Sequence, residues 1–310
     1  MTDGTIGLLR SRCLLGISLL ISAMVTACGA SSSGSASPAF PTLTITAGAS
    51  GYRIQPTTPL PAGTIQVNLR NASHFPTQFK FASPLAGVTL AQVRATVTSG
   101  ALDQLPHEVE MGLGWALPPT QTQTFYLTYQ AGTSFVLSLI SRGPNSPVQA
   151  AQGYLAEFTV RGTQSKGQAQ PKAAGTLSVT AHSVSVPQGF GKGTFAMVNT
   201  DVKDGHELSF FRFTKGAKPL AEVVAKFGAV GLATGPTPPP GPPPEVALGL
   251  RELSSVQPLP PYGCSCIMGS RVLATFALSP GTYVILGMGE DPNTHVLEAT
   301  EGIAAEFTVR

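Results

Sequence analysis

Several short segments of the chain alternate between polar and apolar residues, which is the pattern of a strand with one buried face. The alternation is clear at residues 64–70 and 77–81, and residues 207–213 form an aromatic-rich counterpart. Residues 90–97 and 220–227 instead place apolar side chains at helical spacing. The pattern therefore predicts many short strands and two short helices.

The chain contains two copies of this pattern. Residues 156–161 and 305–310 share the sequence AEFTVR. Other segments correspond in the same order: 42–47 with 176–181, His74 with His206, 90–93 with 220–223, and 132–137 with 281–286. The offset grows from 130 at the helices to 149 at the end, so the second copy holds 149 − 130 = 19 additional residues between these points. A collinear order of this kind indicates an internal duplication.

The duplication predicts two domains, residues 42–161 and 176–310. Residues 162–175 between them are polar and are typical of an exposed linker. The additional residues include 235–244, where seven of ten positions are proline, and this composition favours a stiff polyproline II segment. Each copy has the strand content of a Greek-key β-sandwich with one short helix. The predicted fold class is therefore all-β, with two tandem sandwiches.

The composition agrees with this class and excludes others. The 310 residues include 34 glycines and 27 prolines, which disfavours long helices. Hydrophobic residues make up 42% of the chain, which is enough to bury a core. The net charge is only +3, and no run of basic residues concentrates it. Nucleic acid is therefore not an expected partner.

The amino terminus has the pattern of an export signal. Arg10 and Arg12 precede an uncharged, mostly apolar stretch at residues 13–27. This stretch is short for a membrane span and is typical of a signal peptide. It closes in VTACG at residues 25–29, which resembles the bacterial lipobox. The alternative is an uncleaved membrane anchor in which Cys28 is incidental.

The lipobox resemblance implies that residues 1–27 are removed and that Cys28 carries acyl chains such as palmitate. Residues 28–41 are rich in Ser, Gly, Ala and Pro and suit a flexible tether. Several acyl chains hold a soluble body at a bilayer. We therefore expect a lipid-anchored protein on the extracytoplasmic face of the cell membrane, with membrane lipid as one partner and an envelope protein as a possible second.

The second copy resembles a cupredoxin-like domain. The resemblance rests on Asn199, on His206 and Glu207 at the start of an aromatic strand, on residues 278–286, and on His295 ahead of Gly302 and residues 306–309. Both copies fit this outline. Blue-copper members of the family bind copper through two His, one Cys and a weak axial Met.

This resemblance places His206 and His295 at the two histidine positions. The cysteine position is Gly287 and the methionine position is Ile303, so the thiolate ligand is missing. In the first copy His74 is kept, while Ser138, Ser146 and Tyr154 occupy the other positions. We therefore expect no blue-copper centre and no cofactor, although two histidines alone leave loose copper binding possible. The alternative role of His74 and His206 is to hydrogen-bond near the strand ends.

A sulfur-rich segment keeps copper open as an alternative. Cys264, Cys266 and Met268 alternate along the chain, so an extended segment projects all three to one face. Such soft ligands select Cu(I). The other interpretations are a strained disulfide, two inert thiols, or a redox-active pair without a CxxC motif.

The sequence carries no recognisable catalytic motif. It has no G-x-S-x-G elbow, no P-loop and no G-x-G-x-x-G after a strand. His107-Glu108 and His206-Glu207 start like zinc-protease helices, but Met111 and Phe210 stand where the second histidine is required. The leading hypothesis is a non-catalytic binding or structural lipoprotein. The alternative is a copper-handling envelope protein that uses His206, His295, Cys264, Cys266 and Met268.

Overall fold

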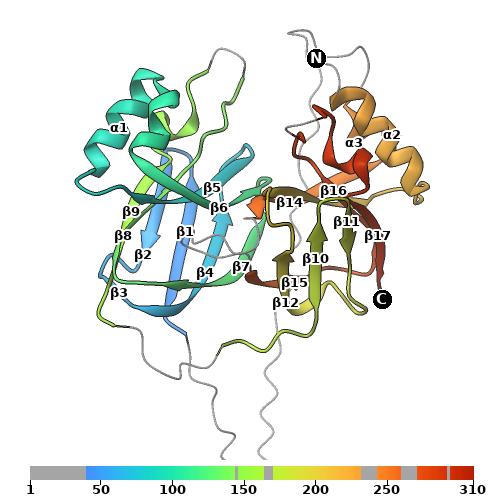
Figure 1. Ribbon diagram of the computed structural model, residues 1–310, viewed down its shortest axis with the longest axis horizontal. Helices are drawn as coiled ribbons and strands as arrows, with labels where there is room; N and C mark the ends of the chain where they lie inside the picture. The colour runs from blue at the N-terminus through green and yellow to red at the C-terminus, as the bar shows by residue number, and fades with distance from the viewer. Residues whose placement is uncertain (1–39, 144–145, 164–169, 232–242, 260–270, 292–293) are drawn as a thin grey trace, which may run out of the picture. The chain divides into compact units, whose positions relative to one another are not determined.

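The computed structural model describes residues 40–143, 146–163, 170–231, 243–259, 271–291 and 294–310 (Figure 1). These all belong to one compact unit, Pro38–Arg310. The predicted signal peptide, Cys28, the sulfur-rich segment and most of residues 235–244 lie outside the described residues, so the predictions on them stay predictions. Within the described residues, no helix has the length and apolar character that crossing a bilayer requires.

The described structure is mostly strand. In the first half, residues 40–161, the strands are β1 (Thr42–Gly48), β2 (Gly51–Gln55), β3 (Leu60–Pro61), β4 (Gly63–Asn71), β5 (Thr77–Pro84), β6 (Val109–Leu117), β7 (Thr122–Tyr129), β8 (Gly132–Leu137) and β9 (Leu155–Arg161). In the second half, residues 176–310, they are β10 (Thr176–Thr180), β11 (Ser183–Ser185), β12 (Lys192–Asn199), β13 (His206–Phe213), β14 (Leu250–Leu259), β15 (Arg271–Ala277), β16 (Gly281–Gly287) and β17 (Ala304–Val309).

The helices are few and short. They are α1 (Leu90–Ser99), α2 (Leu220–Gly231), α3 (Pro244–Leu248) and the 3-10 turns η1 (Leu102–His107), η2 (Gln149–Gln152) and η3 (Glu298–Glu301). A capping box between Thr89 and Gln92 begins α1, and Gly100, with φ of 79°, ends it in the left-handed conformation. The expected helices at residues 90–97 and 220–227 are confirmed.

The strands form two sheets. One has eight strands in the order β11-β10-β12-β15-β7-β4-β1-β2, and the other has nine in the order β17-β16-β13-β14-β6-β5-β8-β9-β3. In both sheets the order of the second half mirrors that of the first half about one junction. The junctions are the antiparallel pairs β15–β7 and β14–β6. The strands of both halves therefore join into continuous sheets, and the proposed domain boundaries stay a prediction.

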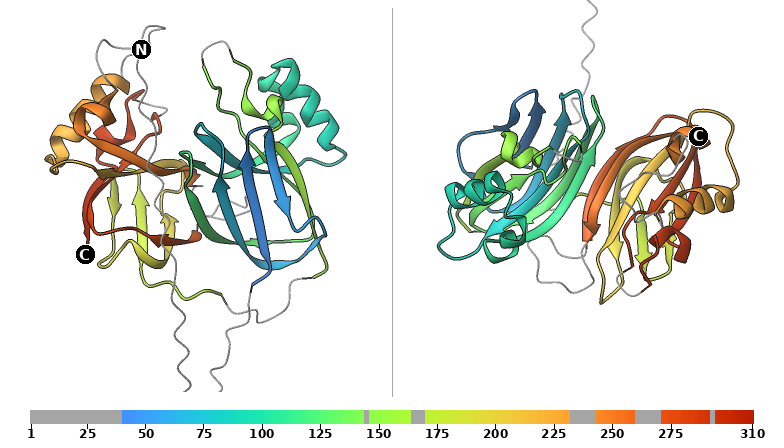
Figure 2. Two further views of the ribbon diagram at one scale, coloured as in Figure 1. Left: turned by 180° about the vertical axis from the view of Figure 1, so that it is seen from behind. Right: turned by 90° about the horizontal axis from the view of Figure 1, so that it is seen from above.

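The main core lies between the two sheets. Its aromatic side chains include Trp115, which stacks on Phe125 with ring centroids 5.0 Å apart, and Phe210, which lies 5.6 Å from Phe276. Two smaller hydrophobic clusters lie under the helices. In the first half, Val93 and Val97 pack α1 onto the strands. In the second half, α2 and α3 cover the corresponding strands (Figure 2). The prediction of an all-β sandwich fold is confirmed.

Candidate functional site

The structure gives His206 and His295 different surroundings. His206 begins β13 and is 3% exposed, with carboxylates on both ring nitrogens. His295 lies in a loop with φ of 56°, its side chain is exposed, and its Nδ1 is 2.9 Å from Glu290 Oε1. Each imidazole therefore has its own carboxylate partners, and the described contacts do not join them into one ligand set.

His206 is the centre of a buried ionic group, here called the His206 cluster, formed with Asp201 and Glu298. Its Nδ1 lies 2.9 Å from Glu298 Oε1 and its Nε2 lies 3.3 Å from Asp201 Oδ2. Burial acts to lower the pKa of His206, but the hydrogen bond and charge of Glu298, helped by Asp201, outweigh it and raise that pKa. The backbone N–H of Lys203 and the charge of His206 lower the pKa of Asp201, against the effect of burial.

The expected cysteine position has no room for a side chain. A Cβ atom on Gly287 would lie 2.8 Å from Glu298 Cβ and 2.9 Å from Ile303 Cβ. Real Cβ atoms essentially never approach so closely. The positions that the cupredoxin resemblance assigns to copper ligands therefore do not fit a blue-copper centre, because Glu298 and Ile303 fill the space and the ring nitrogens of His206 face carboxylates.

The first half contains an uncharged version of the same network. The hydroxyl of Ser138 donates to Gln149 Oε1 at 2.8 Å, and Gln149 Nε2 donates to the carbonyl of Pro76 at 2.8 Å. Ser73 Oγ lies 3.2 Å from Thr77 Oγ1. Ser138 and Gln149 stand 149 residues before Gly287 and Glu298, the offset of the final repeat.

The sheet register corrects the pairing of His74 with His206. Lys80 faces Leu137 in the first half, and Ser209 faces Leu286 in the second. Counting back three residues matches Thr77, not His74, to His206. His74 is exposed before β5. At the offset of the final repeat, Gln149 is the counterpart of Glu298, and Ser146 keeps its place as the counterpart of His295. The match between His74 and His206 is therefore one of residue type only, and the two residues do not occupy equivalent places in the sheets.

An acidic cavity of about 230 Å³ opens beside the His206 cluster. Its carboxylate residues are Asp201, Asp204, Glu290, Asp291, Glu298 and Glu301. Within the described part of the chain, no group of three or more His, Cys, Asp or Glu side chains is arranged to hold a metal ion. The contacts that His206 makes with Asp201 and Glu298 beside this cavity are those of an internal ionic network.

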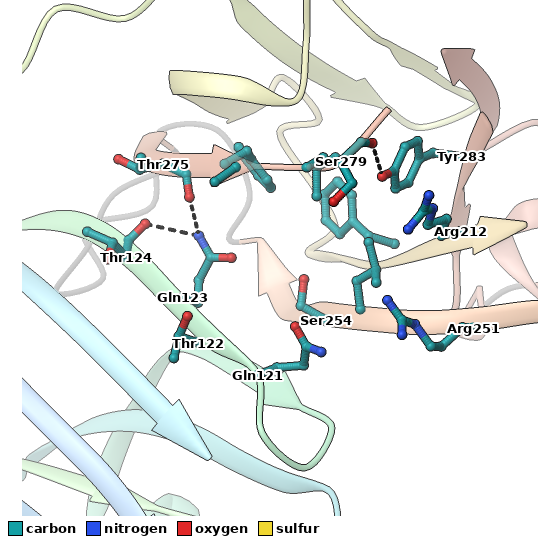
Figure 3. Close-up of a pocket in the computed structure, with 15 residues that line it drawn as sticks. Gln121, Thr122, Gln123, Thr124, Arg212, Arg251, Ser254, Thr275, Ser279 and Tyr283 are labelled. Carbon is teal, nitrogen blue, oxygen red and sulfur yellow. Dashed lines mark hydrogen bonds between the residues drawn. The ribbon is translucent and has the colours of Figure 1, made fainter. Parts of the chain in front are cut away.

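A second cavity, here called the seam cavity, lies where the first half meets the second (Figure 3). It encloses about 300 Å³. Gln121, which precedes β7, lines it together with Thr122 and Gln123 of β7, and the second half provides aromatic rings and arginines. Gln123 Nε2 donates to the carbonyl of Thr275 at 3.0 Å and thereby links β7 to β15. No local pattern in the sequence indicates this cavity.

Two arginines of neighbouring strands line the seam cavity. Arg212 of β13 and Arg251 of β14 are directly opposed in the sheet. Arg212 Nη2 donates to the carbonyl of Pro280 at 2.9 Å, and its guanidinium lies 5.9 Å from the centre of the Tyr283 ring. In Figure 3 both arginines lie on one side of the cavity, across from Gln121 and Thr122.

Comparison with known proteins gives no family assignment. No family model matches the sequence, and no curated protein matches it. Among solved structures, reduced auracyanin from Roseiflexus castenholzii is 20% identical, over 39% of this chain and 97% of that chain, with a TM-score of 0.25. A multicopper oxidase is 14% identical, over 87% and 88%, with a TM-score of 0.22. The copper nitrite reductase of Nitrosomonas europaea is 12% identical, over 87% and 93%, with a TM-score of 0.23. All three TM-scores lie below 0.5.

The His206 cluster predicts a large stability loss when its cation is removed. His206→Gln leaves the carboxylate of Glu298 buried without its partner, so the free energy of unfolding should fall by about 3 kcal/mol. Chemical denaturation measures this change. His295→Gln is the matched control, since the exposed His295 should change stability by less than about 0.5 kcal/mol. If the two substitutions lower the free energy of unfolding by the same amount, the buried ion pair assigned to His206 is wrong.

The raised pKa of His206 predicts a pH-dependent contribution to stability. A raised folded pKa gives stability that is fully present below the unfolded pKa, about 6.5, and is lost as pH rises through the folded pKa. The double substitution His206→Thr with Glu298→Gln places at these two positions the neutral residues that the first half has there, Thr77 and Gln149, and lacks the titration of His206. The stability advantage of the wild type should therefore be larger at about pH 6 than at about pH 9. If the difference in free energy of unfolding between the wild type and the double variant is the same at both pH values, the positive charge assigned to His206 is wrong.

Proposed function

We propose that this chain is a non-catalytic binding module, anchored by lipid on the extracytoplasmic face of the cell membrane. The observation that carries the non-catalytic part of the proposal is the crowding at Gly287, where Glu298 and Ile303 occupy the space that a cysteine ligand requires. The resemblance to cupredoxin-like domains then concerns the scaffold, while the copper positions serve as hydrogen-bonded packing.

The geometry of His206 supports the absence of catalysis. A general base needs a ring nitrogen within reach of a substrate proton. Both ring nitrogens of His206 are instead directed at Asp201 and Glu298, and the side chain is buried. The hydrogen bond and charge of Glu298 raise the pKa of His206, which favours the protonated ring over the form with a basic lone pair. The His206 cluster is therefore suited to holding the loop between β12 and β13, which contains Asp201, against β13, and not to proton transfer.

The anchoring part of the proposal rests on the lipobox pattern around Cys28 and on the tether after it. A protein held in this way works at the membrane surface on ligands or proteins outside the cytoplasm. The alternative function, copper handling, rests on the alternating sulfur atoms of Cys264, Cys266 and Met268, which lie outside the described residues.

Copper titration of the full chain tests the proposed function against its alternative. We expect no absorption band at roughly 600 nm with Cu(II), because the thiolate ligand of blue sites is missing. With Cu(I), we expect the wild type and the Cys264→Ser, Cys266→Ser double variant to compete equally with a chelator. A blue band, or Cu(I) binding that the double variant loses, would replace the proposal with the copper-handling function.

Substitution of Cys28 tests the anchor. Cys28→Ala should abolish incorporation of a palmitate analogue and move the protein from the membrane fraction to the soluble fraction, because acylation requires the thiol. Cys13→Ala is the matched control, since that residue lies in the segment expected to be removed. Labelling of Cys28→Ala, or loss of labelling in Cys13→Ala alone, would contradict the assigned anchor.

A further inference from the structure

The two arginines of the seam cavity form an electrostatically unfavourable pair. Like charges directly opposite each other on neighbouring strands destabilise a sheet. Arg212 and Arg251 form such a pair. The ion pairs of the described residues give neither arginine a carboxylate partner. The positive charge at this place is therefore not neutralised by the described part of the chain.

The fold itself does not require this pair. In the first half, the register that matches Thr77 to His206 also matches Ser83 to Arg212. Ser83 faces Glu110 across β5 and β6, just as Arg212 faces Arg251 across β13 and β14. The same strand pairing is thus built in the first half without any cation. The paired arginines are a property of the second half, beyond what the sheet needs.

The surroundings of Arg212 hold its guanidinium in place. The carbonyl of Pro280 accepts a hydrogen bond from Nη2, and the ring of Tyr283 lies beside the guanidinium. Fixing a long side chain in advance reduces the entropy that a ligand must overcome. A guanidinium presents several donors in a planar fork, which matches the two oxygens of a carboxylate.

The rest of the seam cavity is suited to an apolar body. Phe210, Phe276 and Leu278 line it beside the arginines, together with the hydroxyl of Ser254. Its volume of about 300 Å³ is at the small end of ligand pockets, which span roughly 300–1,000 Å³. Aromatic rings favour an organic portion over a bare inorganic anion, which keeps its hydration shell in water.

We infer that the seam cavity binds a small organic carboxylate, with the carboxylate between Arg212 and Arg251 and the apolar body against Phe210 and Phe276. This inference deepens the proposed function, on which it rests, by naming the ligand class. The ligand bridges the halves, since β7 forms one wall and strands of the second half form the other.

Calorimetric titration of the full chain with benzoate and with hexanoate tests the inference, with benzamide as the uncharged probe. We expect benzoate or hexanoate to bind and benzamide not to bind. Arg251→Gln should weaken binding by about tenfold or more, because it removes one charge-assisted contact. The same substitution should leave the melting temperature without ligand unchanged or raised, because it relieves the repulsion from Arg212. Arg53→Gln, which removes an exposed charge on β2, is the matched control and should bind as the wild type does.

Several results would overturn the inference. These are no binding of either carboxylate, equal binding by Arg251→Gln and the wild type, loss of binding in Arg53→Gln as well, or equal binding of benzamide. Preferential binding of inorganic phosphate would overturn the ligand class. Failure here differs from failure of the proposed function, which would appear as a blue copper band or as Cu(I) binding that depends on Cys264 and Cys266.

Discussion

The structure depends on the antiparallel pairing of β14 with β6 and of β15 with β7. A sandwich built from the first half alone would leave β6 and β7 as sheet edges, with unpaired backbone groups open to other chains. In the observed arrangement the second half supplies a partner strand to both edges. The aromatic core then runs between the sheets without interruption, with Trp115 and Phe210 in one cluster. The second half thus covers both edges within a single chain.

The same junction creates the seam cavity. Because the sheets continue across the junction, the start of β7 comes to lie near β13, β14 and β16, which are far from it in sequence. Gln123 crosses the junction through its hydrogen bond to Thr275. The cavity therefore has no counterpart within either half alone, and its chemistry follows from the residues that only the second half contributes, Arg212 and Arg251 above all.

The sequence predicted several of the strands and both main helices because alternation and helical spacing are local properties. It did not predict the register, which depends on backbone pairing between distant strands. His74 shares a letter with His206, yet Thr77 occupies the equivalent place, because the loop before β5 is shorter. Glu298 was not predicted because the expected copper ligands are imidazole, thiolate and thioether groups, and a carboxylate is none of these. The offset of 149 residues, which matches Glu298 to Gln149, is the sequence signal that points to this position. The joined sheets and the seam cavity are tertiary features that no local pattern encodes.

The two halves place different charges on one hydrogen-bond geometry. Asn71 and Asn199 are both fully buried, and each accepts the backbone N–H two residues later at 2.9 Å. That later residue, Ser73 or Asp201, then contacts the first residue of the next strand, Thr77 or His206. A single change to a charged residue here would leave a buried charge without a partner. The ionic version therefore needs its cation and its carboxylates together, and Asp201, His206 and Glu298 meet this requirement in the second half.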